Sequence, residues 1–186
     1  MEKQNQRVAL SKRMMKEGLL RLLQKKHISK ISVSELCQEA EINRTTFYRH
    51  YQTPADILLE MTLDYVQAFS IQAQASQCSH DVRSYATQLC VFLRRHSDVV
   101  KLFMKNDADL DLTIIFQQLS KAFIGARILL YRGKQLDDAT IQLLNSFFFS
   151  GTYALIRKWL TEEVPKSPEE VAELLCCSFD VDFSFQ

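Results

Sequence analysis

Apolar residues recur at intervals of three and four along almost the whole chain, which is the period of an amphipathic α-helix. Only four glycines and three prolines interrupt this pattern, fewer than the tight turns of a sheet-rich protein require. We therefore predict an all-α fold of roughly nine helices. The spacing places these helices at about residues 8–26, 33–40, 44–50, 54–75, 81–95, 97–104, 110–131, 138–163 and 168–179.

Helix-start signals in the first third of the chain define two short helices. Ser32, followed three residues later by Glu35, forms a capping box ahead of the second helix. Asn43 is a favoured N-cap for the third helix, and Thr53 followed by Pro54 starts the fourth. Two short helices after a longer one are typical of the tri-helical core of a helix-turn-helix protein.

The third helix has one apolar face and one polar face. Phe47 and Tyr51 are four residues apart and point toward the same side, which we expect to be the core. The major groove of B-DNA is about 12 Å wide and accepts a helix whose outer face is polar. The residues left to face outward are Arg44, Thr45, Tyr48 and Arg49.

Charge is unevenly distributed, although the net charge is only +1. Residues 1–60 contain eleven Lys and Arg against seven Asp and Glu, a balance of +4. The remainder contains twelve against fifteen, a balance of −3. A basic N-terminal part on a slightly acidic body fits a polyanionic partner such as double-stranded DNA.

The segment from Ser32 to Tyr51, with its Thr-Thr-Phe-Tyr-Arg-His-Tyr sequence, closely resembles the TetR/AcrR family of bacterial regulators over about residues 8–60. Residues 151–160, Gly-Thr-Tyr-Ala-Leu-Ile-Arg-Lys-Trp-Leu, look like the dimerisation helix of a Gram-positive branch. The resemblance implies a helix-turn-helix DNA-binding domain over residues 1–54 and a ligand-sensing and dimerisation domain over 55–186. It implies a cytoplasmic homodimer that binds a palindromic operator, acts as a repressor, and responds to a small-molecule effector.

Residue roles follow from the same resemblance. The third helix would enter the major groove, where the base-contacting residues are Arg44, Thr45 and Arg49. The residues expected to contact phosphates are Ser32, Ser34, Thr46, Tyr48 and His50.

Two positions depart from the family pattern. The turn between the second and third helices carries Glu41 where glycine is frequent, and the fourth helix opens with Pro54 where lysine is frequent. Both changes are expected to weaken DNA affinity rather than the fold. The basic residues available to compensate are Lys3, Arg7, Lys25, Lys26 and Lys30.

The family resemblance also predicts dimerisation through the last two helices. Leu143, Phe147 and Ala154 line the eighth helix, and the alternative is that its apolar residues belong to the core of a single chain. The residues predicted at the interface are Leu144, Phe148, Gly151, Leu155, Trp159, Leu174 and Leu175. The side chains expected to line an effector pocket, or to pack as core, are Tyr65, Phe69, Tyr85, Phe92, Phe103 and Phe116.

Other classes of function have little support. The sequence contains no GxSxG, HExxH or Walker motif, so we predict no enzymatic activity, catalytic residue or cofactor. Five cysteines without a CxxC pair argue against a zinc site or a disulfide framework. No apolar run reaches the ~18 residues of a membrane helix. The main alternative is a TetR-like coregulator that binds proteins and has lost DNA binding.

Overall fold

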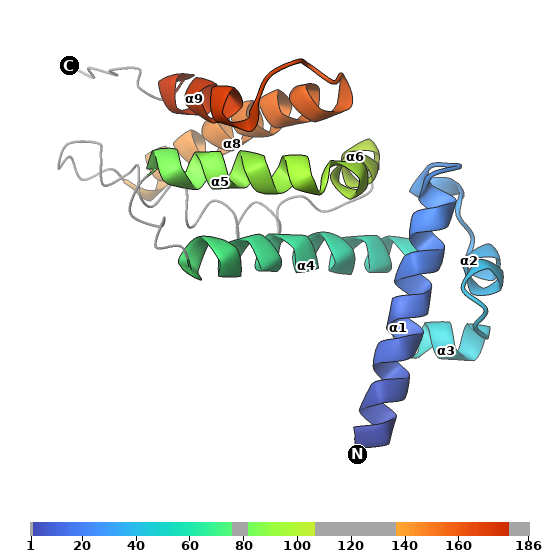
Figure 1. Ribbon diagram of the computed structural model, residues 1–186. Coiled ribbons are helices and arrows are strands. Elements are labelled where there is room, and N and C mark those ends of the chain that lie inside the picture. Colours follow the sequence, from blue (N-terminus) through green and yellow to red (C-terminus); the bar gives the residue numbers. More distant parts are fainter. Residues whose placement is uncertain (1, 76–81, 107–136, 179–186) are drawn as a thin grey trace. The chain divides into compact units, whose positions relative to one another are not determined.

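The computed structural model describes residues 2–75, 82–106 and 137–178 (Figure 1). Every regular element in these ranges is a helix, which confirms the predicted all-α fold class. The helix predicted over residues 110–131 lies outside the described residues. None of the helices in the described ranges is both long and apolar enough to cross a membrane.

The chain divides into two compact units. The first comprises Met1–Tyr65 with Leu102–Leu112, and the second comprises Val66–Lys101 with Thr113–Gln186. The helices α4 (Pro54–Ala75) and α6 (Ser97–Lys105) each contribute residues to both units. The domain boundary predicted after residue 54 was placed from the DNA-binding motif, and it stays a prediction.

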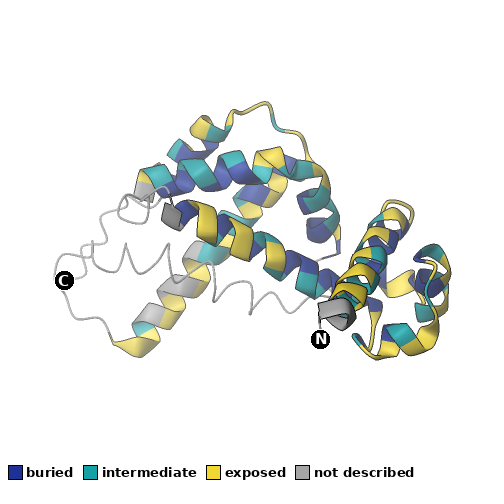
Figure 2. Cartoon of the chain, turned by 60° about the horizontal axis from the view of Figure 1, so that its bottom comes forward, coloured by how far each residue is buried: buried dark blue, intermediate teal, exposed yellow. Residues whose placement is uncertain are grey.

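The first unit is built around α1 (Glu2–Leu23), which α2 (Val33–Glu39), α3 (Arg44–Tyr48) and the start of α4 follow in sequence. A 3₁₀ turn, η1 (Ile28–Lys30), connects α1 to α2. Buried apolar side chains from these helices form the core of the unit, as the dark blue positions in Figure 2 show. Its fully buried members include Met15, Leu19, Leu36, Phe47, Ile57 and Leu58.

The close approach of α1 and the end of α2 explains why a glycine occupies position 18. A Cβ placed on Gly18 would lie 3.0 Å from the Cβ of Ala40 and 3.2 Å from its Cα. These distances are shorter than ordinary van der Waals contacts, so a side chain at position 18 would force the two segments apart. The packing of α2 against α1 therefore depends on this glycine.

The start of α1 differs from its prediction. The helix begins at Glu2, whereas the apolar pattern placed its start at about Val8. The additional residues are polar, so they carry no hydrophobic period, yet Glu, Lys, Gln and Arg all have high helix propensity. The apolar pattern therefore could not reveal the first turns of α1.

The second unit contains α5 (Val82–Arg95), α8 (Asp138–Thr161) and α9 (Pro168–Ser178). Helices α5 and α9 pack along each other (Figure 1). Both α8 and α9 start at capping residues. The Asp137 carboxylate accepts a hydrogen bond from the Thr140 amide, and the Ser167 hydroxyl accepts one from the Glu170 amide.

Asn106, directly after α6, provides a buried polar contact in the first unit. Its Oδ1 accepts a hydrogen bond from the backbone N–H of Ile28 at 2.8 Å, and its Nδ2 donates to the carbonyl of Leu102 at 2.7 Å. Both groups of the amide are therefore satisfied, although the side chain is almost completely buried. The contact ties the end of α6 to the turn after α1.

Candidate DNA interface

The helix-turn-helix of the first unit starts from two side-chain caps. The Ser32 Oγ accepts a hydrogen bond from the Glu35 amide at 3.2 Å, and the Asn43 Oδ1 accepts one from the Thr46 amide at 2.7 Å. Each bond satisfies one of the amides that a helix N-terminus leaves without a partner. Both caps were predicted from the sequence, and both are confirmed.

The turn between α2 and α3 has the left-handed backbone conformation at Glu41, with φ of 53°. Glycine adopts this conformation freely, whereas an L side chain costs roughly 1–2 kcal/mol there. The side chain of Glu41 is exposed, and within the described residues no cation pairs with its carboxylate. The turn therefore bears both local strain and an uncompensated negative charge next to α3.

The outer face of α3 is polar and open to solvent. Phe47 is completely buried beneath it, and Tyr48 is 60% exposed with its ring edge-to-face against Phe47. Thr46 and His50 are partly exposed. The three residues predicted to contact bases, Arg44, Thr45 and Arg49, are all exposed. The helix ends at Tyr48, so Arg49 and His50 lie in the turn that follows it.

The predicted phosphate contacts at the start of α2 are also accessible. Ser32 and Ser34 are exposed, and the Ser32 oxygen accepts its capping bond, which leaves the hydroxyl proton available to donate. Asn43, which the sequence predicted only as a cap, offers a further hydrogen-bond donor. Its Oδ1 is used by Thr46, while its exposed amide N–H₂ group retains two donors. An amide side chain rather than a carboxylate at an N-cap is the sequence signal for this second role.

Ion pairs divide the basic residues of the first unit into two groups. Lys26 Nζ lies 2.5 Å from Glu35 Oε1, so the charge of Lys26 is largely neutralised and compensates less than expected. The side chain of Lys3 is not among those described. The other paired cations are Lys12, Arg13, Lys16 and Arg21. The cations without an ion pair in the described part of this unit include Arg7, Lys25, Lys30, Arg44 and Arg49.

The start of α4 offers little to a phosphate group. The Asp56 carboxylate accepts hydrogen bonds from the amides of Gln52 and Thr53, both at 2.8 Å. Pro54 has no amide proton and is buried. The Gln52 and Thr53 amides are therefore already used, Pro54 supplies none, and the Asp56 carboxylate places a negative charge beside them.

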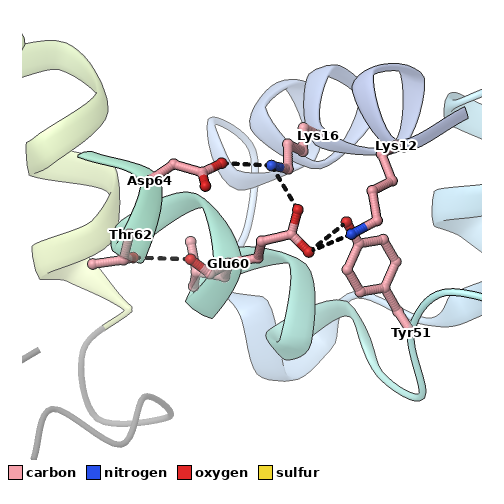
Figure 3. A network of polar contacts seen from close by, with 7 residues as sticks. Lys12, Lys16, Tyr51, Glu60, Thr62 and Asp64 are labelled. Atoms are coloured by element: carbon pink, nitrogen blue, oxygen red, sulfur yellow. Dashed lines mark hydrogen bonds and ion pairs between the residues drawn. The ribbon is translucent and has the colours of Figure 1, made fainter. Parts of the chain in front are cut away.

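Behind α3, a polar network joins the chain to α1 and α4 (Figure 3). Glu60 Oε2 accepts hydrogen bonds from the Tyr51 hydroxyl at 3.1 Å and from Lys12 Nζ at 2.9 Å. Glu60 Oε1 lies 2.8 Å from Lys16 Nζ, which also donates to Asp64 at 2.6 Å. We call these five residues the Glu60 network.

The network keeps its central carboxylate ionised. Partial burial raises the pKa of Glu60, but hydrogen bonds and charge from Lys12 and Lys16 outweigh this effect and lower the pKa to about 2. Burial, together with the adjacent Glu60 carboxylate, raises the pKa of Tyr51, so its hydroxyl remains a donor. The Tyr51–Glu60 bond therefore joins a neutral phenol to a carboxylate.

The aromatic residues predicted to line an effector pocket fall into two packed groups. In the second unit Phe69 contacts Tyr85 and Phe92, with ring centroids 5.3 and 5.4 Å apart. In the first unit Tyr65 contacts Phe103 at 5.6 Å. Burial raises the pKa of Tyr85 to about 12. Phe116 lies outside the described residues.

The predicted dimer residues are divided between surface and core. Gly151 is exposed, with no atom of the described residues within 4 Å of a Cβ placed on it, Leu155 is partly exposed, and Leu174 is exposed. Trp159 and Leu175 lie in the core of the single chain, where the indole Nε1 donates to the Lys166 carbonyl at 2.9 Å. The side chains of Leu144 and Phe148 are not among those described.

Exposed apolar residues on α8 form a stripe. Leu143 is 73% exposed and Phe147 is 65% exposed, and Gly151 and Ala154 continue at helical spacing on the same face. Exposed apolar side chains that recur on one helix face indicate a surface that another protein covers. We call these four residues the α8 stripe.

Known proteins similar to this chain are transcriptional regulators. The family model for the TetR-type transcriptional regulator C-terminal region matches residues 81–179. A search of curated proteins found no match.

Among solved structures, a TetR transcriptional regulator from Streptococcus agalactiae 2603V is similar, with a TM-score of 0.73 and 18% identity over 94% of this chain and 96% of that one. A TetR transcriptional regulator from Rhodococcus sp. RHA1 has a TM-score of 0.60 and 15% identity over 97% and 100%. The dihydroxyacetone kinase operon activator DhaS has a TM-score of 0.55 and 16% identity over 90% and 93%. These similarities show the fold, and the family match covers more than half of the sequence. The chain belongs to the TetR family of transcriptional regulators.

Proposed function

We propose that this chain is a dimeric, sequence-specific DNA-binding regulator whose affinity for its operator is modulated by an effector. The observation that carries the proposal is the outer face of α3. Arg44 and Thr45 are exposed on this helix and Arg49 is exposed directly after it, while the opposite side of the helix is fixed by the buried Phe47. A capped helix with a polar outer face and a buried apolar inner face meets the requirements for binding in the major groove.

Dimerisation would bring two such helices to one operator. A two-fold dimer matches a palindromic site whose half-sites are separated by about one helical turn of DNA, ~34–36 Å. The α8 stripe, with Leu174 on α9, is an apolar surface of the kind that a second copy of this chain would cover. We expect the paired chains to form a four-helix bundle from α8 and α9.

Effector control would act by population shift. An effector that binds better to a conformer with its two DNA-binding helices wrongly spaced lowers operator affinity by the ratio of its two affinities. Thr152 supports a ligand site in the second unit, because its Oγ1 is buried and has no hydrogen-bond partner among the residues that the structure describes. A buried orphan hydroxyl is costly unless something else satisfies it.

We propose repression as the mode of action, because a dimer on an operator blocks access to DNA by steric exclusion alone. The similar fold of DhaS, an operon activator, makes activation the second candidate. A reporter placed under each selected operator distinguishes them. Deletion of the regulator raises expression if it represses and lowers expression if it activates.

The DNA-binding proposal is tested by selection. The full chain is used to enrich sites from a pool of random 24-base-pair duplexes, and affinity is then measured for an enriched duplex and for its scrambled counterpart at several salt concentrations. Arg44→Ala should reduce the preference for the enriched duplex about 5- to 150-fold if Arg44 contacts a guanine. His50→Ala should weaken binding to both duplexes, because a phosphate contact carries no sequence information. Arg13→Ala is the control, since Arg13 is exposed on α1 and pairs with Glu17.

The second candidate function is a coregulator without DNA binding. Glu41 and Asp56 favour it, because both place carboxylates at turns where the DNA backbone would approach. If the wild-type chain enriches no sequence and shows no salt-dependent binding at low ionic strength, the coregulator replaces the DNA-binding function. If it binds DNA but neither Arg44→Ala nor His50→Ala has an effect, the residue roles are wrong.

A further inference from the structure

The Glu60 network connects the chain just after α3 to α1 and α4. The Glu60 carboxylate on α4 accepts from donors on two other segments, which are Lys12 and Lys16 on α1 and Tyr51 after α3 (Figure 3). Lys12 Nζ also lies over the Tyr51 ring, 5.2 Å from its centroid. Two interactions therefore fix the position of Tyr51, one at its hydroxyl and one at the face of its ring.

Apolar packing alone leaves the orientation of α3 weakly determined. The helix spans only Arg44–Tyr48, and its buried anchors are Phe47 and Tyr51. Burial of these rings is favourable but non-directional, whereas a hydrogen bond restricts both distance and angle. Asn43 fixes the N-terminal end of α3 through its cap, and the Tyr51 hydroxyl fixes the chain as it leaves the C-terminal end.

We propose that Tyr51 and Glu60 are positioning residues for sequence-specific DNA binding, and that their hydrogen bond sets the orientation of α3 relative to α1 and α4. The inference rests on the proposed DNA-binding function. Base contacts tolerate little misplacement, because bidentate hydrogen bonds require narrow geometry. Phosphate contacts to long or mobile side chains tolerate more. Loss of the bond therefore reduces discrimination between sequences before it reduces attraction to DNA.

Electrostatics separates this positioning role from a charge effect. Two lysines and two carboxylates make the network neutral as a whole. Tyr51→Phe removes a hydroxyl without changing any charge and keeps the ring that packs against Phe47. An effect of this variant on DNA binding therefore comes from geometry, and the dependence of affinity on salt should stay as in the wild type.

The test compares Tyr51→Phe and Glu60→Gln with a control, Asp64→Asn. Asp64 belongs to the same network and pairs with Lys16, but it makes no hydrogen bond with Tyr51. Each variant is confirmed as folded by its thermal transition. Its affinity is then measured for an enriched 24-base-pair duplex and for the scrambled duplex, at a temperature well below that transition.

Tyr51→Phe should lower the ratio of specific to non-specific affinity about five- to tenfold, a change of the size expected for the coupling between residues in contact. Its affinity for the scrambled duplex and the slope of affinity against salt should stay unchanged. The double variant of Tyr51→Phe with Glu60→Gln should have the same ratio as Glu60→Gln alone, because the hydroxyl acts through that carboxylate. Asp64→Asn should retain the wild-type ratio. If Glu60→Gln does not fold, Tyr51→Phe alone decides the question.

Three results overturn the proposal, and they are distinguishable. An unchanged ratio in Tyr51→Phe, with normal discrimination by the wild type, removes the positioning role and leaves the DNA-binding function intact. An equal loss in Asp64→Asn shows that any contact between α1 and α4 has the same effect, so Tyr51 has no special part. Absence of discrimination in the wild type itself removes the DNA-binding function on which the inference rests.

Discussion

Glu41 combines strain and charge at one residue, and the two can be separated by substitution. Glu41→Gly should relieve the left-handed strain and raise the free energy of unfolding by about 0.5–1 kcal/mol, because the gain exceeds the added freedom of glycine in the unfolded chain. Glu41→Gln keeps the strained backbone and removes the charge. Urea denaturation measures the first effect, and salt-dependent DNA titration measures the second.

Both Glu41 variants should bind DNA more tightly, since both remove a carboxylate beside α3. Only Glu41→Gly should be more stable. An increase in stability of equal size in Glu41→Gln would show that charge repulsion, rather than backbone conformation, is the cost at this turn.

The Thr152 hydroxyl has no hydrogen-bond partner in the described part of the chain, so it allows a test of the proposed effector site at a single atom. Thr152→Val removes the orphan oxygen and retains the shape and branching of the side chain, so it should stabilise the effector-free protein by about 1 kcal/mol. Thr161→Val on the same helix is the control, because the Thr161 hydroxyl donates to the Arg157 carbonyl and its loss should not stabilise. Thermal unfolding measures both. A destabilised Thr152→Val would mean that the hydroxyl has a partner in solution.

Local capping interactions were predictable from the sequence, and pairings between helices were not. The caps Ser32 and Asn43 depend on amides three residues away, so spacing alone identifies them. The bond between Tyr51 and Glu60 depends on how α4 packs against α3 and α1, which no local pattern encodes. For the same reason Trp159, assigned to an interface from its helical position, lies in the core of one chain.

At the scale of helices, two glycines with opposite surroundings should respond oppositely to alanine. Gly18→Ala places a methyl group 3.0 Å from the Cβ of Ala40, so the cost of separating α1 and α2 should exceed the gain in helix propensity. Gly151→Ala meets nothing within 4 Å, so within one chain it should stabilise α8 by up to about 1 kcal/mol.

Circular dichroism during urea unfolding, at protein concentrations where the chain is monomeric, distinguishes the two glycine variants. We expect Gly18→Ala to unfold at a lower urea concentration than the wild type, because its free energy of unfolding is lower by about 1–3 kcal/mol. If Gly18→Ala is as stable as Gly151→Ala, the close approach of α1 and α2 does not exist in solution.

The contact between α1 and α4 should depend on pH through Glu60. Its pKa of about 2 in the folded protein is below its ordinary value of 4.5, so its contribution to stability is complete above about pH 4.5 and is lost as the pH falls toward 2. At pH 7 we expect Glu60→Gln to cost about 1–2 kcal/mol, at the low end of the ~1.5–3 kcal/mol for hydrogen bonds to a charged group because the carboxylate is partly exposed. The difference from the wild type should shrink between pH 4.5 and 2.

Denaturant titrations at several pH values measure this difference, and Asp64→Asn provides the comparison for a more exposed carboxylate in the same network. A constant cost of Glu60→Gln across the acid range would show that the ionised form of Glu60 does not contribute.

Helix boundaries could be predicted only where the sequence carries a local signal for them. The start of α4 at Pro54 was predicted from its cap, whereas the polar first turns of α1 gave no period to detect.

At the scale of the whole molecule, the α8 stripe is the feature on which the expected oligomeric state depends. The apolar pattern of α8 could be divided into core and surface only by the structure, which buries Trp159 and exposes Leu143 and Phe147. Large apolar side chains on a water-facing helix are unfavourable in an isolated chain and favourable once a second copy covers them. We therefore expect another molecule to cover this surface, as the proposed dimer would.

Phe147→Glu should convert a dimer into a monomer, because it places a charge without a partner at the centre of the stripe. Ile71→Glu is the control, since Ile71 is an apolar residue of α4 with similar exposure, 60% against 65% for Phe147. Sedimentation velocity measures the mass of each variant. A monomer reaches only one half-site, so operator affinity should fall by about 100-fold or more while α3 itself is unchanged. A dimeric Phe147→Glu would place the interface elsewhere, and a monomeric Ile71→Glu would move it to α4.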